Sequence, residues 1–147
     1  MMTQIKLGEF KYYGKAVGKQ RARYSSKTNR FYTPQKTVDA EDLIAMTYRT
    51  TGGKKSNGAV AVEIWHGVSV ERASTKKDRA AKLLGKLFPL KKPDIDNTLK
   101  LVLDALKGSA YNDDVQVCGC NYIRTYTEQD VLFIRVYEYV WKDDDGE

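Results

Sequence analysis

The chain has 147 residues and a formal net charge of +6, with 41% hydrophobic and 30% charged residues. This composition is typical of a globular domain that buries its own core, and it excludes a disordered or fibrous chain. No run approaches the roughly 20 apolar residues of a membrane span, and the polar N-terminus lacks a signal peptide's apolar segment. We therefore expect a cytoplasmic protein without membrane association.

The first part of the chain predicts a strand, a basic loop and a helix. Imperfectly alternating apolar and polar residues favour a strand over 4–13. Glycines and the turn cluster SSKTN predict a basic loop or mobile ribbon over 14–33. Pro34 is typical of a first helical turn, and Gly52 and Gly53 end the helix that follows. We expect its apolar face to carry Val38, Leu43, Met46 and Ile44.

The remaining elements predict an α+β fold. An apolar, β-branched run favours a strand over 58–70, and helices are predicted over 74–88 and from about residue 96 to Gly108. Two strands, 115–127 and 130–141, are separated by few polar residues and should pair as a hairpin. This order predicts a single domain, residues 1–147, with a small mixed or antiparallel sheet and helices packed on one side.

Charge is distributed unevenly along the chain. Residues 1–37 contain nine Lys or Arg and one acid, and residues 71–92 contain eight against two. The last ten residues contain one Lys and five acids, so 142–147 form an acidic tail. Basic surfaces attract polyanions, of which nucleic acid is the commonest, but the pattern is equally typical of a soluble protein that is merely basic.

Cysteine and histidine are too few for a zinc site. Cys118 and Cys120 form a C-x-C that favours two reduced thiols, and His66 is the only histidine. Carboxylates and lysines are therefore the remaining candidates for catalysis.

Five aspartates gather between residues 91 and 117. In extended backbone Asp94 and Asp96 face the same side, and Asp114 joins them if the strand after it runs back along the helix. Three close carboxylates repel each other unless a cation neutralises them, and oxygen ligands suit Mg²⁺ or Mn²⁺.

A purely structural interpretation of the same aspartates stays open. Asp96 is a plausible helix cap, and Asp94 is favoured near a helix N-terminus by the helix dipole. Lys100 and Asp104 form an ordinary i, i+4 pair, and Asp113 and Asp114 are common turn residues.

The stretch KPDIDNTLKLVLDALKGSAYNDDVQV resembles the core motif of the RusA family of Holliday junction resolvases, which are Mg²⁺-dependent endodeoxyribonucleases of bacteria and their phages. That motif has a D-x-D-N, a Lys four residues after the second Asp, a D-A-L helix end and a D-D-x-Q-V, all present here. GKQRARYSSKTNRFYTP and STKKDRAAKLLG extend the resemblance over most of the chain.

The resemblance implies roles for individual residues. It implies catalysis and metal binding by Asp94, Asp96 and Asp114, with Lys100 as the catalytic lysine. Asn97 and Asp113 match motif positions as supporting residues, and we assign Asp104 to a pair with Lys100 or to the helix end. The resemblance also implies that Mg²⁺ is the cofactor, with Mn²⁺ as a substitute. It further implies that the protein is a homodimer and cleaves four-way DNA junctions to leave 5′-phosphate and 3′-hydroxyl ends.

The basic loop supplies candidate DNA contacts. Alternating basic residues form a cationic edge suited to a phosphate backbone: Lys19, Arg21, Arg23, Lys27 and Arg30. Tyr24, Phe31 and Tyr32 could pack beneath these residues or stack on exposed bases, and we expect Phe31 and Tyr32 to belong to the core. Three alternatives stay open: a non-catalytic DNA-binding module, a nuclease for other branched DNA, and another D-x-D enzyme such as a nucleotidyltransferase. The last is disfavoured because the chain lacks a Gly-rich nucleotide-binding loop.

Overall fold

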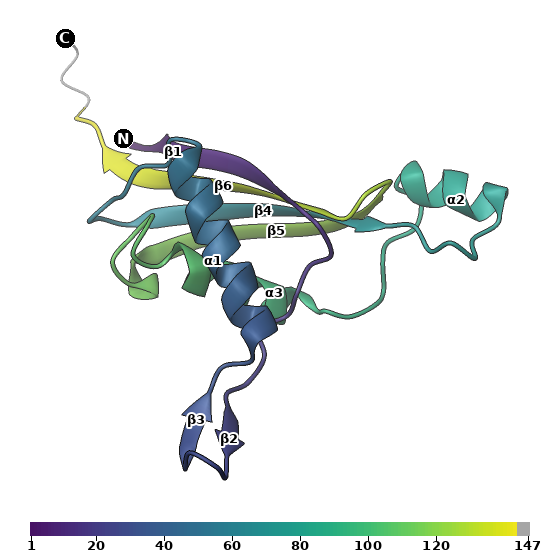
Figure 1. Cartoon of the computed structure of the whole chain (residues 1–147). Coiled ribbons are helices and arrows are strands. Elements are labelled where there is room, and N and C mark those ends of the chain that lie inside the picture. The colour runs from purple at the N-terminus through teal and green to yellow at the C-terminus, as the bar shows by residue number, and fades with distance from the viewer. Residues whose placement is uncertain (144–147) are drawn as a thin grey trace.

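The computed structural model describes residues 1–143, so most of the predicted acidic tail at 142–147 lies outside the described residues. A four-stranded sheet in the order β1-β6-β4-β5 forms the centre of the molecule (Figure 1). The strands are β1 (Met2–Tyr13), β4 (Val60–Ser69), β5 (Val117–Thr127) and β6 (Val131–Trp141). β6 is antiparallel to both of its neighbours, whereas β4 and β5 are parallel, so the sheet is mixed.

Two helices, α1 (Gln35–Thr50) and α3 (Ile95–Leu106), cover one face of this sheet (Figure 1). Apolar residues facing each other across this interface form the core, among them Ile44, Val62, Leu101, Val102 and Ile134. The predicted α+β fold in one domain with a mixed sheet is therefore confirmed. No helix in the described residues is long and apolar enough to cross a bilayer.

The predicted pairing of the last two strands is wrong. β5 and β6 are connected by a short turn, but β4 lies between them and pairs with both. The turn is secured across the end of β4, because the Asp130 side chain accepts a hydrogen bond from the Ser69 N–H at 2.9 Å. β4 is the strand with the most buried residues. In its central position both of its edges are paired with neighbouring strands.

Two helix predictions need correction. The helix predicted over 74–88 is the shorter α2 (Lys76–Leu83), capped by Thr75, whose Oγ1 accepts from the Asp78 N–H at 3.1 Å. Gly85 follows with φ of 81°, a conformation that ends the helix. In α1 the buried residues include Ile44, as expected, but Leu43 and Met46 are exposed, because the helix rests on Thr37, Ala40 and Tyr48 instead.

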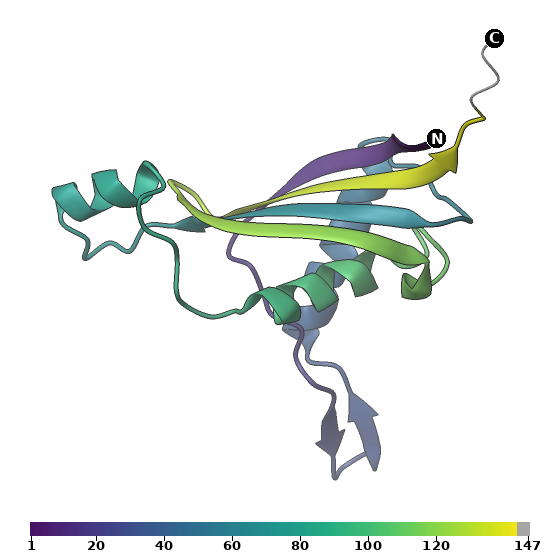
Figure 2. The same ribbon diagram turned by 180° about the vertical axis from the view of Figure 1, so that it is seen from behind.

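Two segments project from this body. One is the antiparallel ribbon of β2 (Arg23–Ser25) and β3 (Arg30–Tyr32), which points away from the sheet and helices in both views (Figures 1 and 2). The other carries α2 beyond the end of the sheet (Figure 1). The prediction that Phe31 and Tyr32 belong to the core is wrong, because both side chains lie exposed on the ribbon.

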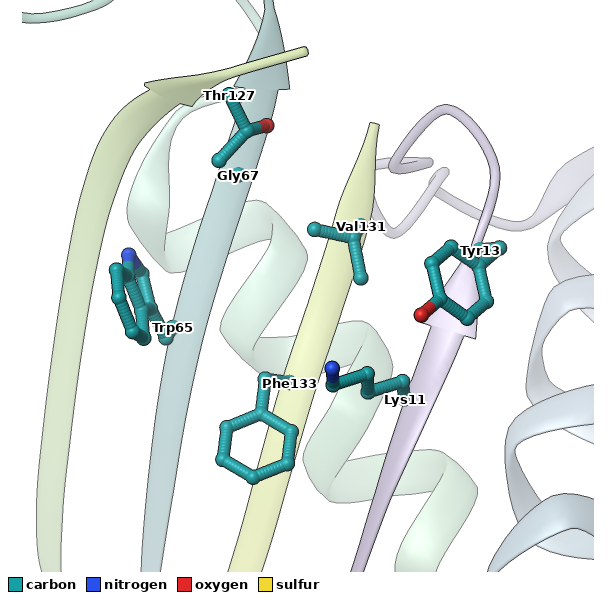
Figure 3. A pocket seen from close by; sticks show the side chains of 7 residues that line it. All are labelled: Lys11, Tyr13, Trp65, Gly67, Thr127, Val131 and Phe133. Atoms are coloured by element: carbon teal, nitrogen blue, oxygen red, sulfur yellow. The ribbon is translucent and has the colours of Figure 1, made fainter. Parts of the chain in front are cut away.

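Within residues 1–143 no helix covers the second face of the sheet. Trp65 and Phe133 project from it beside Lys11 and Tyr13 (Figure 3). With Gly67, Thr127 and Val131 they line a shallow depression of about 310 Å³.

Candidate metal and nucleic-acid site

Asp94 and Asp96 lie together at the N-terminal end of α3. Asp94, rather than Asp96, is the N-cap residue, and Asp96 lies in the first helical turn, where its carboxyl group contacts that of Asp94. Asn97 Nδ2 donates to Asp94 Oδ1 at 2.7 Å, so the amide fixes the orientation of this carboxylate. Desolvation raises the pKa of Asp94, but contacts with Asp96 and Asn97 outweigh it and hold the pKa below its usual value. Both side chains are exposed to solvent.

Asp113 and Asp114 form a second pair, just before β5. Asp114 begins the short 3-10 helix η1 (Asp114–Gln116), which takes the place of the start of the strand predicted over 115–127, and Val115 is exposed. Gln116 organises this turn: its Oε1 accepts from the backbone N–H groups of Asn112 and Asp113 at 2.7 and 3.0 Å. Contact with Asp114 and the charge of Lys107 lower the pKa of Asp113. Gln116 was visible in the D-D-x-Q pattern but was not assigned a role.

The two aspartate pairs lie at opposite ends of α3. A helix of 12 residues is about 18 Å long. β5 does run back along α3, as the metal hypothesis requires, but its first residues lie at the C-terminal end of the helix (Figure 2). Within residues 1–143 no three His, Cys, Asp or Glu side chains form a group able to hold a metal ion. One chain alone therefore does not assemble the predicted three-carboxylate site.

The Asp94–Asp96 pair by itself fits a hard divalent cation. Mg²⁺ is usually bound through one or two carboxylates, with water and substrate phosphate completing its octahedron. Two adjacent, exposed carboxyl groups match that donor set. Asp114 lies away from this pair, so the predicted joint metal site remains a prediction.

Lys100 and Asp104 do not form the expected pair. Lys100 is exposed one turn after Asp96, on the same side of the helix, and has no ion-pair partner within residues 1–143. Asp104 instead contacts Lys19, with Oδ2 3.2 Å from Nζ. Lys100 is thus a free cation beside the Asp94–Asp96 pair.

Lys19 holds the base of the β2–β3 ribbon on the body. Its ammonium group also binds Glu41, and its backbone N–H donates to the Asn97 carbonyl at 3.1 Å. Desolvation lowers the pKa of Lys19, but Glu41 and Asp104 outweigh it and raise the pKa. Both acids neutralise its charge, which leaves Lys19 less suited than its neighbours to the predicted phosphate contact.

The other predicted DNA-binding residues are available to a ligand. All are exposed, and within the described part of the chain none forms a salt bridge: Arg21, Arg23, Lys27 and Arg30.

The remaining titratable groups of note are structural. His66 is buried with its Nδ1 2.8 Å from the Tyr122 hydroxyl, and both cysteines are free thiols, as predicted.

Comparison with known proteins defines the class. Residues 14–137 match the family model of endodeoxyribonuclease RusA, so the chain belongs to the RusA endodeoxyribonuclease family. The matched range contains the β2–β3 ribbon and both aspartate pairs. A Bacillus subtilis (strain 168) protein, named uncharacterized protein YqaN, is 29% identical over 137 residues, covering 88% of this chain and 95% of that protein.

Proposed function

We propose that this protein is a Mg²⁺-dependent endonuclease that resolves four-way DNA junctions by paired, symmetric nicks. The observation that supports this most directly is the exposed Asp94–Asp96 pair, oriented by Asn97 and flanked by the free Lys100, in a chain of the RusA family. Such a group is suited to phosphodiester hydrolysis, where charge develops on phosphoryl oxygens.

Each side chain has a distinct task in this proposal. Asp94 and Asp96 hold Mg²⁺, or Mn²⁺ in its place, and Asn97 keeps Asp94 in position. An ion bound there would supply an activated water and would neutralise charge on the scissile phosphate. Lys100 lies one helical turn away and stabilises the negative charge of the transition state. The products expected are 5′-phosphate and 3′-hydroxyl ends.

We further propose that Asp114 enters the site from a second copy of the chain. β5 is an edge strand of 11 residues whose outer edge pairs with no other strand of residues 1–143. Such an edge is a template for pairing with another chain. Because α3 lies along β5 (Figure 2), antiparallel pairing of two β5 edges would also place the two α3 helices antiparallel. The Asp113–Asp114 turn of one copy would then approach Asp94 and Asp96 of the other.

This C₂ dimer suits the substrate as well as the site. A four-way junction is nicked on two symmetrically placed strands, and a two-fold dimer carries two equivalent sites in matching orientation. The exposed arginines and Lys27 of the ribbon are proposed to contact phosphates without reading sequence, so affinity should fall steeply with salt. Lys19 is left out of this contact because Glu41 and Asp104 bind it.

The first test compares cleavage of a labelled four-way junction, a fork, a flap and a linear duplex in Mg²⁺ and in EDTA. Asp96→Asn should lose at least about 100-fold in cleavage rate while still binding the junction. Asp42→Asn, at an exposed position on α1, is the matched control and should cut normally. Binding by wild type without any cutting would instead identify a non-catalytic module, and faster cutting of the fork or flap would identify a different branched substrate.

Mixing two inactive variants tests where Asp114 acts. If each site combines Asp94 and Asp96 of one copy with Asp114 of the other, a heterodimer of Asp96→Asn and Asp114→Asn contains one intact site. Co-expressed and co-purified variants should then regain single nicks at junctions. No recovery, despite verified heterodimers, would show that the site does not combine acids from two copies.

A further inference from the structure

The β2–β3 ribbon exposes an aromatic surface that the body of the protein does not cover. Tyr24, Phe31 and Tyr32 are 56%, 75% and 48% exposed, although the ribbon has only three paired residues in each strand. Two-stranded ribbons are marginally stable alone, and adjoining exposed aromatic side chains mark a contact surface. These aromatic residues therefore point to a partner outside the chain.

The ribbon has two chemically different faces. Tyr24 is paired with Phe31 across the strands, and their rings meet edge-to-face with centroids 5.4 Å apart. Side chains alternate between the faces of a strand, so Arg23 and Arg30 lie on the opposite face from this aromatic pair. Tyr24 is further fixed by its hydroxyl, which donates to Asn29 Oδ1 at 2.9 Å. One face thus carries the apolar Tyr24–Phe31 pair, and the other carries Arg23 and Arg30 together with Tyr32.

The charge of the segment identifies the kind of partner. Residues 14–33 contain six Lys or Arg and no Asp or Glu. A partner that is both polyanionic and able to present flat apolar faces is a nucleic acid with unstacked bases. In a continuous duplex the base faces are stacked on each other, whereas base pairs at a branch point expose them.

The attachment of the ribbon places it near the proposed chemistry. The backbone N–H of Lys19 donates to the Asn97 carbonyl at 3.1 Å, and Gly18 packs against Asn97 and Pro93. From Lys19 to Tyr24 the chain spans at most about 17 Å, or roughly five base-pair steps. The aromatic face is therefore within reach of bases close to a phosphate bound at Asp94 and Asp96.

We propose that the Tyr24–Phe31 pair stacks on exposed bases at the branch point and thereby distinguishes junctions from linear duplex, while Arg23 and Arg30 contact phosphate on both. This inference rests on the proposed function, since it assigns the basis of substrate selectivity to that same enzyme. Arginine contacts to phosphate occur on any DNA, so the aromatic face is the part of the ribbon that senses the branch.

Binding in EDTA tests this inference without cleavage. The affinities of Phe31→Ala, Phe31→Trp and Phe31→Leu for a junction and a linear duplex of equal size are compared with wild type. Loss of base stacking should lower junction affinity on the order of 10- to 100-fold in the Ala variant and leave duplex affinity nearly unchanged. Trp should preserve the preference and Leu, which is apolar but not planar, should not. A 2-aminopurine at the branch should be quenched by wild type and less by Phe31→Ala.

Arg30→Ala is the matched control on the opposite face. It should weaken junction and duplex binding in parallel. For each DNA, the slope of log affinity against log salt concentration should become about one unit shallower. The inference would be overturned if Phe31→Ala weakened junction and duplex binding in parallel, or if it left the preference for junctions unchanged. A changed oligomeric state of Phe31→Ala in sedimentation would also overturn it, because the aromatic face would then contact a second copy of the chain. Circular dichroism verifies that the variants fold. Wild type that fails to cut junctions would refute the proposed function, whereas retained cutting and selectivity in Phe31→Ala would refute only the branch contact.

Discussion

The body of the molecule and its two projecting segments use the same apolar residue types in opposite ways. In the body, Ile44, Leu132 and Ile134 are fully buried between the sheet and the helices. In the ribbon Phe31 is exposed, and beyond α2 Leu90 is 93% exposed, together with Leu84, Leu87 and Phe88. Burial removes apolar surface from water and stabilises the fold, so the projecting residues contribute little to folding.

This difference separates folding from recognition. Both projecting segments join the body beside Asp94 and Asp96, one through Gly18 and Lys19 and the other through the loop that leads from α2 into Pro93. Both are also strongly basic. The body thus supplies a rigid support for the acid pair, and the segments on either side of it supply surfaces that can bind a large polyanion.

A pair of truncations provides the strongest test of this division. Ile134→Ala removes a fully buried side chain from the central part of β6 and should lower the free energy of unfolding by about 2–5 kcal/mol. Phe31→Ala removes a larger side chain from the ribbon and should change the free energy of unfolding by less than about 0.5 kcal/mol. Urea denaturation followed by circular dichroism measures both. Similar losses for the two variants would show that the ribbon is part of the cooperative fold.

The parts of the fold that were predictable are those fixed by local pattern. β1, β4 and α1 follow from alternation, a β-branched run and a Pro at the helix start, and α3 lies within the helix predicted from about residue 96 to Gly108. The insertion of β4 between β5 and β6 was not predictable, because a short polar turn normally indicates a hairpin. Strand order depends on how buried surface is distributed over the whole sheet, and a local sequence pattern does not determine it.

A pH dependence centred on His66 gives a smaller, body-specific effect. Desolvation, with a contribution from Arg124, lowers the pKa of His66 to about 4, whereas 6.5 is its ordinary value. Between these values the unfolded chain binds a proton that the folded chain does not, so stability falls as the pH falls through this range. From pH 7 to pH 5 the loss should reach up to roughly 2 kcal/mol.

The matched variant is His66→Gln, which keeps a polar partner for the Tyr122 hydroxyl but cannot titrate. Urea unfolding at pH 7, 6 and 5 should show a much smaller loss in this variant. The interval also avoids the titration of Glu71, because the contact with Lys82 lowers the pKa of Glu71 to about 2 and its contribution to stability is lost only below pH 4.5. An equal loss in variant and wild type would assign the acid sensitivity to other groups.

The site was predictable in its residue types and not in its assembly. The D-x-D spacing indicates that Asp94 and Asp96 face one point, and their contact agrees. The position of Asp114 depends on the length of α3, which places the two pairs at opposite ends. Asp104 could be matched to Lys100 by helical spacing, yet it binds Lys19, a residue 85 positions earlier, because tertiary packing brings the base of the ribbon to the helix.

The smallest effect concerns how α2 is attached to the body. Glu71 accepts hydrogen bonds from Lys82 Nζ at 2.9 Å and from the Tyr126 hydroxyl at 2.8 Å, and Lys82 also lies over the Tyr126 ring. Glu71→Gln keeps the shape but removes the charge, and because Glu71 is partly exposed its ion pairs are screened by solvent. Amide hydrogen exchange of α2 should therefore accelerate only by roughly two- to fivefold, with the urea midpoint unchanged.

Glu9→Gln is the matched control, since Glu9 joins Lys6 and Arg135 on the sheet, far along the chain from α2. It should leave exchange in α2 as in wild type. Unchanged exchange in Glu71→Gln would show that the helix is held by other contacts, and a shifted urea midpoint would show that α2 unfolds together with the body. Faster exchange confined to α2 would mean that this segment opens independently of the sheet and helices, so Glu71 would hold α2 on the body without contributing to the cooperative fold.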